Sequence, residues 1–312
     1  MNTILFGDCK QSLKTFAAFG VKAQCCITSP PYFGLRSYGD AADEMGKEET
    51  PEEFVENLVE VFRLVRDVLA DDGVVFLNMG DSYASRGGQG PQTNAGALRG
   101  TGEQPTKSNR FHGGDCKIKD LIGVPWMLAF ALRADGWYLR QDIIWSKAES
   151  GDVREGRCMP ESVRDRFTKA HEYVFLLSKS PTYFLNVDAV KEPAQDWGKP
   201  RDRSNMRGGT DDPKLKHGGL SKVNHPMGNR RSVWRVNPGG FKGAHFAVFP
   251  AALVEPCVLS GSRPGDIVLD PFMGSGTTAG VALKHGRQYI GCELYESYRE
   301  LHAARIKQIT SA

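Results

Sequence analysis

Short apolar runs bounded by turn residues alternate along the chain with segments of helical spacing. The runs that predict strands are residues 3–6, 24–28, 73–78, 139–145, 171–177, 266–269 and 288–292. Segment 51–69 begins with Pro51 and two glutamates and then repeats apolar residues at intervals of three and four, which predicts a helix. Segments 277–285 and 295–309 predict further helices. This alternation is typical of an α/β fold whose mostly parallel sheet is covered by helices on both faces.

Two stretches do not follow this pattern. Residues 80–120 contain nine glycines and few apolar side chains, and residues 193–243 are rich in Gly, Asn, Arg and Lys. Segment 192–242 carries 11 Lys and Arg against 5 Asp and Glu, whereas the whole chain has a net charge of only +3. A polyanion is the natural partner of such a segment, although a solvated basic loop has the same composition.

The remaining composition narrows the class of protein. The chain has no run of about 18 apolar residues, and its first residues lack the pattern of a signal peptide, so we expect a soluble, cytoplasmic protein without a membrane span. The seven cysteines are scattered without paired spacing, which predicts reduced thiols and neither a zinc site nor disulfides.

Residues 264–293 have the order strand, glycine turn, helix, strand. Gly274 and Gly276 permit backbone angles closed to other residues, and the acidic Glu293 at the tip of the second strand is placed to accept hydrogen bonds from ribose hydroxyls. A tight turn without any ligand fits the glycines as well, and so does a nicotinamide nucleotide. Asp270 beside the turn disfavours a pyrophosphate, because the two anions repel, and favours a cationic adenosyl ligand such as S-adenosylmethionine.

Residues 24–34 form an apolar strand that runs into Ser29, Pro30, Pro31 and Tyr32. The two prolines fix the backbone and remove two amide donors, so the Pro30 carbonyl and the Ser29 side chain become rigid acceptors. A plain proline bend with a packed tyrosine has the same sequence.

These two segments carry a resemblance to a known family. The sequence TSPPY at 28–32 resembles motif IV of DNA amino-methyltransferases, and DPFMGSGTT at 270–278 resembles their motif I. Further segments resemble the other motifs of the family: 7–9 motif III, 73–83 motif VI, 166–179 motif VIII and 245–253 motif X. Motif IV precedes motif I, with the basic segment between them, and this order is similar to that of the β class.

The resemblance implies a circularly permuted, Rossmann-like methyltransferase fold with a sheet of about seven strands. Residues 1–191 would form the catalytic part with its glycine-rich loop at 80–120, residues 192–243 a short target-recognition segment, and residues 244–312 the cofactor-binding part. The strand that ends near Asp8 and the strand that ends at Glu293 would then be neighbours, although they lie at opposite ends of the chain.

The resemblance also implies the chemistry. Ser29 and the Pro30 carbonyl would each accept an N–H from the exocyclic amine of a flipped base, Tyr32 would stack on that base, and attack on the methyl group would be direct. Asp8 is matched to the adenine amino group, Glu293 to the ribose, and Asp270 with Gly274 to the methionine end, while Phe249 and Phe272 wall the pocket. The other residues implied for the cofactor site are Cys9, Pro271, Ser275, Gly276, Thr277 and Thr278.

The implied substrate is double-stranded DNA. The candidates for phosphate or guanine contacts are Arg201, Arg203, Arg207, Lys214, Lys216, Arg230 and Arg231. The short recognition segment favours a homodimer, and a restriction endonuclease is a possible companion of a bacterial or phage-encoded enzyme acting at the nucleoid. Ser29 before the prolines leans toward N4 of cytosine over N6 of adenine. RNA and protein-glutamine methyltransferases share the same chemistry and stay open, as do a nicotinamide-dependent oxidoreductase and a DNA-binding relative without activity.

Overall fold

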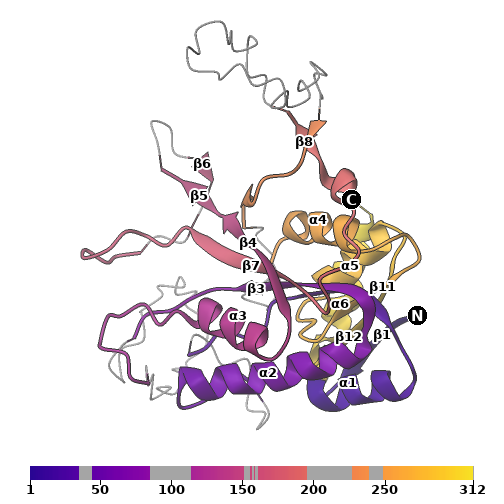
Figure 1. The fold of residues 1–312 in the computed structure, drawn as a ribbon, viewed down its shortest axis with the longest axis horizontal. Helices are drawn as coiled ribbons and strands as arrows, with labels where there is room; N and C mark the ends of the chain where they lie inside the picture. Colours follow the sequence, from indigo (N-terminus) through magenta and orange to yellow (C-terminus); the bar gives the residue numbers. More distant parts are fainter. Residues whose placement is uncertain are drawn as a thin grey trace, which may run out of the picture.

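The computed structural model describes residues 1–34, 44–84, 114–150, 155–156, 158, 161–194, 227–238 and 249–311. The central sheet consists of β1 (Asn2–Phe6), β2 (Ala23–Thr28), β3 (Leu69–Met79), β4 (Tyr138–Ser146), β7 (His171–Ser178), β10 (Val233–Arg235), β11 (Ile267–Asp270) and β12 (Gln288–Glu293). They lie side by side in the order β1, β12, β11, β2, β3, β7, β4, β10 (Figure 1). The predicted α/β fold is therefore confirmed, and all seven predicted strands are present.

The two ends of the chain meet at one edge of this sheet. β1 pairs in parallel with β12, so that Phe6 lies opposite Glu293, and the Gly7 amide donates to the Glu293 carbonyl over 2.9 Å. β12, β11, β2 and β3 continue the parallel part, and β7 is antiparallel to its neighbours β3 and β4. The pairing of β1 with β12 confirms that the strands at opposite chain ends are neighbours, as the permuted motif order implies.

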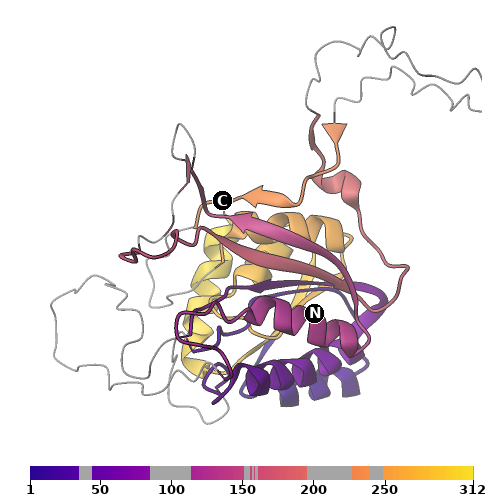
Figure 2. The same ribbon diagram turned by 60° about the vertical axis from the view of Figure 1, so that its left-hand side comes forward.

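Helices cover both faces of the sheet (Figures 1 and 2). The first face is covered by α1 (Cys9–Ala18), α2 (Pro51–Val68) and α3 (Val124–Ala134), and the second by α4 (Ala251–Gly261), α5 (Thr277–Lys284) and α6 (Arg299–Thr310). Side chains of the first three helices join one buried apolar cluster with β3 and β7, and side chains of the last three join a second cluster. The sheet thus separates two cores.

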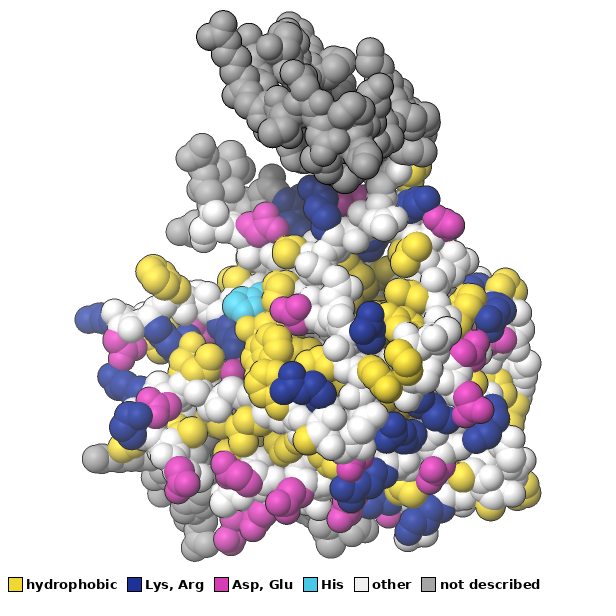
Figure 3. All heavy atoms as spheres, in the orientation of Figure 1, with side chains coloured by type: hydrophobic (Ala, Val, Ile, Leu, Met, Phe, Trp, Pro, Cys, Tyr) yellow, Lys and Arg dark blue, Asp and Glu magenta, His cyan; other side chains and the backbone are white. Residues whose placement is uncertain are grey.

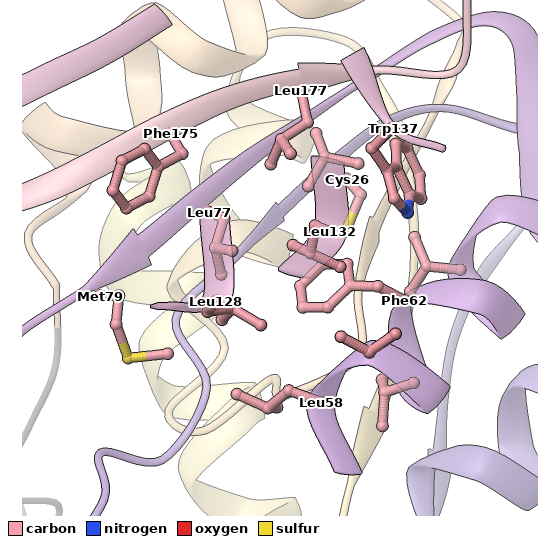
Figure 4. Packing of buried hydrophobic residues seen from close by; sticks show 14 of the residues in the cluster. Cys26, Leu58, Phe62, Leu77, Met79, Leu128, Leu132, Trp137, Phe175 and Leu177 are labelled. Carbon is pink, nitrogen blue, oxygen red and sulfur yellow. The ribbon is translucent and has the colours of Figure 1, made fainter. Parts of the chain in front are cut away.

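The sequence of α2 explains both its formation and its burial. Thr50 caps it by accepting a hydrogen bond from the Glu53 amide over 3.2 Å, and Pro51 occupies its first turn. Its apolar face is fully buried at Phe54, Leu58 and Phe62. Figure 4 shows this packing. Leu58 and Phe62 of α2 lie close to Leu128 and Leu132 of α3. The same cluster includes four side chains of the sheet, Leu77 and Met79 of β3 and Phe175 and Leu177 of β7.

The helices differ from the sequence prediction in two ways. Segment 295–309 was predicted as one helix, but its start forms the 3₁₀ turn η4 (Glu296–Tyr298), and α6 begins only at Arg299. Helices α1, α3 and α4 were not predicted. The sequences VPWMLAFALRA of α3 and AALVEPCVLSG of α4 are almost wholly apolar, so they lack the polar face that marks a surface helix.

The stretches predicted as irregular are described only in part. Most of residues 80–120 and 193–243 lie outside the described residues. Within the second stretch, β10 adds an eighth strand beside β4, and Trp234 of β10 is buried. Two small ribbons pair β5 (Ala148–Glu149) with β6 (Glu155–Gly156), and β8 (Glu192–Pro193) with β9 (Met227–Gly228); a 3₁₀ turn, η1 (Val187–Val190), precedes β8. In the part of the chain that the structure describes, no helix has the length and apolarity needed to cross a membrane.

Candidate active site

A pocket lies at the edge of the sheet where the parallel strands β1, β12, β11 and β2 end. Ten of its lining residues are ones that the sequence analysis assigned to the site: Asp8, Cys9, Ser29, Pro31, Phe249, Pro271, Phe272, Gly274, Ser275 and Glu293. Carboxyl ends of neighbouring parallel strands meet at one edge, which is why segments from both ends of the chain share this pocket. The structure thus brings Ser29 and the glycine turn together.

The glycine turn is held by the acidic strand end. Gly274 and Gly276 have φ angles of 53° and 88°, in the left-handed region that favours glycine. One oxygen of Glu293 accepts a hydrogen bond from the Gly274 amide over 2.9 Å, and the other accepts from the Tyr295 amide over 3.1 Å. Burial raises the pKa of Glu293 to about 7. The protonation of this carboxylate therefore changes near neutral pH.

Asp270 lies behind the pocket and not in its lining. Its side chain is fully buried, and its two oxygens accept hydrogen bonds from the hydroxyls of Thr28 and Thr278, each over 2.7 Å. The Phe272 amide donates to it over 3.0 Å. Burial raises the pKa of Asp270 to about 6, although these donors lower it. Asp270 thus ties the last residue of β2, directly before Ser29, to the glycine turn.

The remaining residues predicted for the cofactor take two kinds of position. Asp8 caps α1 by accepting from the Lys10 amide over 2.9 Å and faces the pocket. Cys9 also lines it, but burial, with the nearby Asp8, raises the pKa of its thiol to about 12, so it is no nucleophile. Gly276 and Thr277 do not line the pocket: Gly276 precedes α5, and the Thr277 hydroxyl lies 3.3 Å from that of Ser275.

The catalytic segment points in two directions. Ser29 and Pro31 line the pocket, Pro30 is buried, and Tyr32 turns away from the pocket toward β3 and β7. The Tyr32 hydroxyl donates to Glu172 over 2.6 Å and lies 3.2 Å from the side-chain oxygen of Asn78. The Ser29 hydroxyl donates to the same Asn78 oxygen over 3.1 Å.

A group of three residues behind Ser29 and Tyr32 was missed by the sequence analysis. Asn78 donates through its amide nitrogen to Glu172 over 3.3 Å and to the Tyr173 carbonyl over 3.1 Å, which leaves its oxygen facing Ser29. Lys147 forms an ion pair with the other oxygen of Glu172. Asn78 lies in the segment that resembles motif VI and Glu172 in the segment that resembles motif VIII, and these resemblances were the signals in the sequence.

Further pocket residues were not among the predicted site residues, although Gly7, Met273 and Cys292 lie in segments that the sequence analysis named. These further residues are Gly7, Glu44, Met45, Met273, Cys292, Leu294, Tyr295 and Tyr298. Glu44 is buried, accepts a hydrogen bond from the Tyr295 hydroxyl over 2.8 Å and pairs with Lys47 over 2.6 Å. This contact joins the segment before α2 to the segment after β12. Neither the hydrophobic pattern nor the spacing of motifs in the sequence predicts this contact.

The lining suits S-adenosylmethionine. Among the described residues that line the pocket, Asp8, Glu44 and Glu293 are acidic, four are aromatic and none is Lys or Arg. Carboxylates and aromatic rings favour a cationic, adenosine-containing ligand, whereas the pyrophosphate of a nicotinamide nucleotide would meet like charge. The residues present therefore fit this cofactor.

Of the seven basic residues predicted for DNA, two are described. The Arg230 guanidinium lies 4.9 Å from the centre of the Trp234 ring, and Arg231 pairs with Glu192 over 2.6 Å. The other five, Arg201, Arg203, Arg207, Lys214 and Lys216, lie outside the described residues.

The fold and this pocket define a methyltransferase that uses S-adenosylmethionine. Residues 23–304 match the model of a family described as DNA methylase, and the chain belongs to this family of N4-cytosine and N6-adenine DNA amino-methyltransferases. It is 42% identical over 309 residues to the Type II methyltransferase M.SmaI of Serratia marcescens, covering 97% of this chain and 90% of that protein. The family resemblance stated from the motifs is thereby confirmed.

Solved structures agree on the fold. The PvuII DNA methyltransferase, described as cytosine-N4-specific, has a TM-score of 0.59 at 17% identity, and the match covers 100% of this chain and 91% of that one. A DNA modification methylase of Thermus thermophilus, solved with S-adenosylmethionine, has a TM-score of 0.56 at 23% identity, covering 99% and 95%. Membership in the DNA methylase family favours DNA over the RNA, protein and nicotinamide alternatives.

Proposed function

We propose that this site-specific DNA amino-methyltransferase acts on N4 of cytosine, with Ser29 and the Pro30 carbonyl as the two acceptors of the target amine. The observation that carries the proposal is that Ser29, from the amino-terminal part, lines the same pocket as Gly274 and Glu293, from the carboxyl-terminal part. A nitrogen held by Ser29 would therefore lie beside the cofactor. Serine in place of a carboxylate supports cytosine.

The contacts of Ser29 support its role as an acceptor. Glu172 and the Tyr173 carbonyl accept the two hydrogens of the Asn78 amide, so the Asn78 oxygen is the group that faces Ser29. Ser29 donates its only proton to that oxygen. Both lone pairs of the hydroxyl then remain for the substrate, and they would accept an N–H of the exocyclic amine as positive charge develops on the nitrogen.

Tyr32 serves as the surface on which the flipped base stacks. Its hydroxyl donates a hydrogen bond to Glu172, and Glu172 in turn pairs with Lys147. Stacking contributes about 1–3 kcal/mol per base, which offsets part of the cost of removing a base from the duplex. A tyrosine that is held at its hydroxyl presents its ring in one orientation.

The cofactor supplies an electrophilic methyl group, and we assign its binding to the pocket residues. Glu293 would accept from the ribose hydroxyls, Asp8 from the adenine amine, and Phe249 and Phe272 would contact the adenosine. Asp270 acts indirectly, because its buried carboxylate holds Thr28 and the Phe272 amide in place. The Asp270→Ala variant should therefore lose cofactor binding, whereas Tyr32→Ala should keep it and lose turnover. Calorimetric titration with S-adenosylmethionine measures the first effect, and unimpaired binding by Asp270→Ala would refute this assignment.

We further propose that residues 192–243 recognise the DNA sequence and that the enzyme works as a homodimer. The excess of six positive charges in this segment supports the first statement, and its shortness supports the second. Analytical ultracentrifugation with and without DNA tests the dimer. A restriction endonuclease encoded beside the gene would fit the Type II names of relatives such as M.SmaI.

Expression in a bacterial host without DNA methylation, followed by genome sequencing that detects modified bases, tests the proposed function. The expected result is N4-methylcytosine at one short sequence, and its absence in a strain that expresses Ser29→Ala. Methyladenine at one sequence would overturn the choice of base and leave the enzyme class intact. An unmodified genome in the presence of folded, cofactor-binding protein would overturn the function itself.

A further inference from the structure

The loop of residues 161–170 projects from the edge of the sheet that carries the catalytic segment. β7 is antiparallel to β3 and β4, and His171 at its start pairs with Ser146 at the end of β4. The residues before His171 therefore emerge at the same edge as Ser29 and Tyr32. Figures 1 and 2 both show this loop extending away from the body of the molecule. Glu172, which follows His171 in β7, accepts a hydrogen bond from the Tyr32 hydroxyl.

Phe167 is exposed to an unusual degree in this loop. Its side chain is 97% exposed, and the next most exposed large apolar side chain in the described residues is Phe19 at 78%. Burial of a phenylalanine is worth about 1.5–3 kcal/mol. Phe167 does not contribute this stabilisation to the fold, so its ring is available to contact a partner.

Contacts on both sides of Phe167 anchor the loop. The Arg166 guanidinium lies 3.9 Å from the centre of the Tyr83 ring and forms an ion pair with Glu161. Asp165 pairs with Lys119, and Lys169 lies 3.7 Å from a carboxylate oxygen of Asp81. A loop fixed on either side of an exposed ring presents that ring in a defined place.

The ring is surrounded by basic residues that slightly outnumber the carboxylates of Glu161, Asp165 and Asp81. Arg164, Arg166 and Lys169 belong to the loop, and Lys119 contacts it. In the space-filling view, dark blue, magenta and yellow side chains are mixed on the left of the molecule, where the loop projects (Figure 3). Lysine and arginine meet phosphates, and an apolar side chain between them can enter the base stack.

We propose that Phe167 enters the DNA duplex at the target position and fills the space that the flipped base leaves. This inference rests on the proposed function, because only an enzyme that extrudes its target base needs such a residue. An extruded base leaves its two neighbours without a stacking partner, and the phenylalanine ring supplies one. Phe167 is thus a positioning residue, which holds the open duplex while Ser29 and Tyr32 hold the base.

The test compares two duplexes that contain the recognition sequence found by genome sequencing. In the first the target base is paired, and in the second an abasic site stands opposite it, so that extrusion costs less. Phe167→Ala should reduce the single-turnover methylation rate on the paired duplex by about 5- to 150-fold, the loss expected from one stacking contact. On the second duplex the same variant should approach the wild-type rate. Affinity for S-adenosylmethionine should stay unchanged on both.

Two further variants make the result specific. Phe167→Trp keeps a stacking ring and should retain the rate on the paired duplex. Phe19→Ala removes an exposed aromatic side chain at the end of α1, away from the catalytic edge, and should behave as wild type. A Phe167→Ala variant that is as active as wild type on the paired duplex, or equally impaired on both duplexes, overturns the inference. Failure of the wild-type protein to methylate either duplex would instead overturn the proposed function.

Discussion

Replacing Asn78 with aspartate tests the proposed orientation of Ser29, because the two side chains have the same shape and differ in charge. Asn78 donates to Glu172 over 3.3 Å and accepts from Ser29 over 3.1 Å. In Asn78→Asp a second carboxyl group would face that of Glu172 at that distance, and each would carry a negative charge when deprotonated. At an effective dielectric constant of about 20, two such charges repel by about 5 kcal/mol. The pair therefore keeps one shared proton to a pH well above the ordinary range of a carboxyl group.

The shared proton makes the outcome depend on pH. When the new carboxyl group at position 78 carries the proton on the oxygen that faces Glu172, it donates a hydrogen bond to Glu172 and accepts one from Ser29. These are the hydrogen bonds that Asn78 makes in the wild type. At higher pH the proton is lost, the repulsion displaces the side chain, and Ser29 loses its fixed orientation. We expect Asn78→Asp to approach the wild-type rate near pH 6 and to fall about 10- to 100-fold below it near pH 9, the loss of one hydrogen bond to a developing charge.

The quantity to measure is the ratio of the Asn78→Asp rate to the wild-type rate at each pH. Single-turnover methylation of DNA that contains the recognition sequence gives both rates. Asn78→Leu, which has neither donor nor acceptor, should be impaired at every pH and serves as the control. Calorimetry should show unchanged affinity for S-adenosylmethionine in both variants. A ratio of Asn78→Asp to wild type that does not vary with pH would show that Asn78 does not orient Ser29.

Two other variants address the cofactor side and the helix packing. Burial raises the pKa of Glu293 to about 7, so a fall in pH protonates the carboxylate that would accept from the ribose. The wild-type Kd for S-adenosylmethionine should therefore rise as the pH falls through 7, whereas the Kd of Glu293→Gln should be independent of pH. Calorimetry measures both values, and equal pH dependence in the two proteins would contradict the assignment. A methyl group on Gly280 would lie 2.9 Å from the Ile309 side chain, so Gly280→Ala should lower the free energy of unfolding by about 1–3 kcal/mol, and an unchanged urea midpoint would disprove this packing argument.

Much of the fold and part of the site are properties of contiguous sequence. The seven predicted strands, the helix α2 and the glycine turn each depend on residues within one short window, where periodicity, capping and backbone freedom act. The motif segments around Ser29 and Gly274 are likewise contiguous. The prolines of the first segment and the glycines of the second set the local backbone conformation. The helices α3 and α4 were missed because nearly uniform apolar segments carry no periodicity, and their helical form depends on the sheet that they cover.

The sequence by itself determined the α/β class, the two chemical segments and the order of motifs that makes the protein a permuted methyltransferase. Only the tertiary structure decided which way Asp270 points, because two threonine hydroxyls from different elements compete with any ligand for its oxygens. It also brought Asn78, Glu172 and Lys147 together from β3, β7 and the end of β4. Contacts between strands that are distant in the chain follow from register and packing, and no local pattern of residues encodes them.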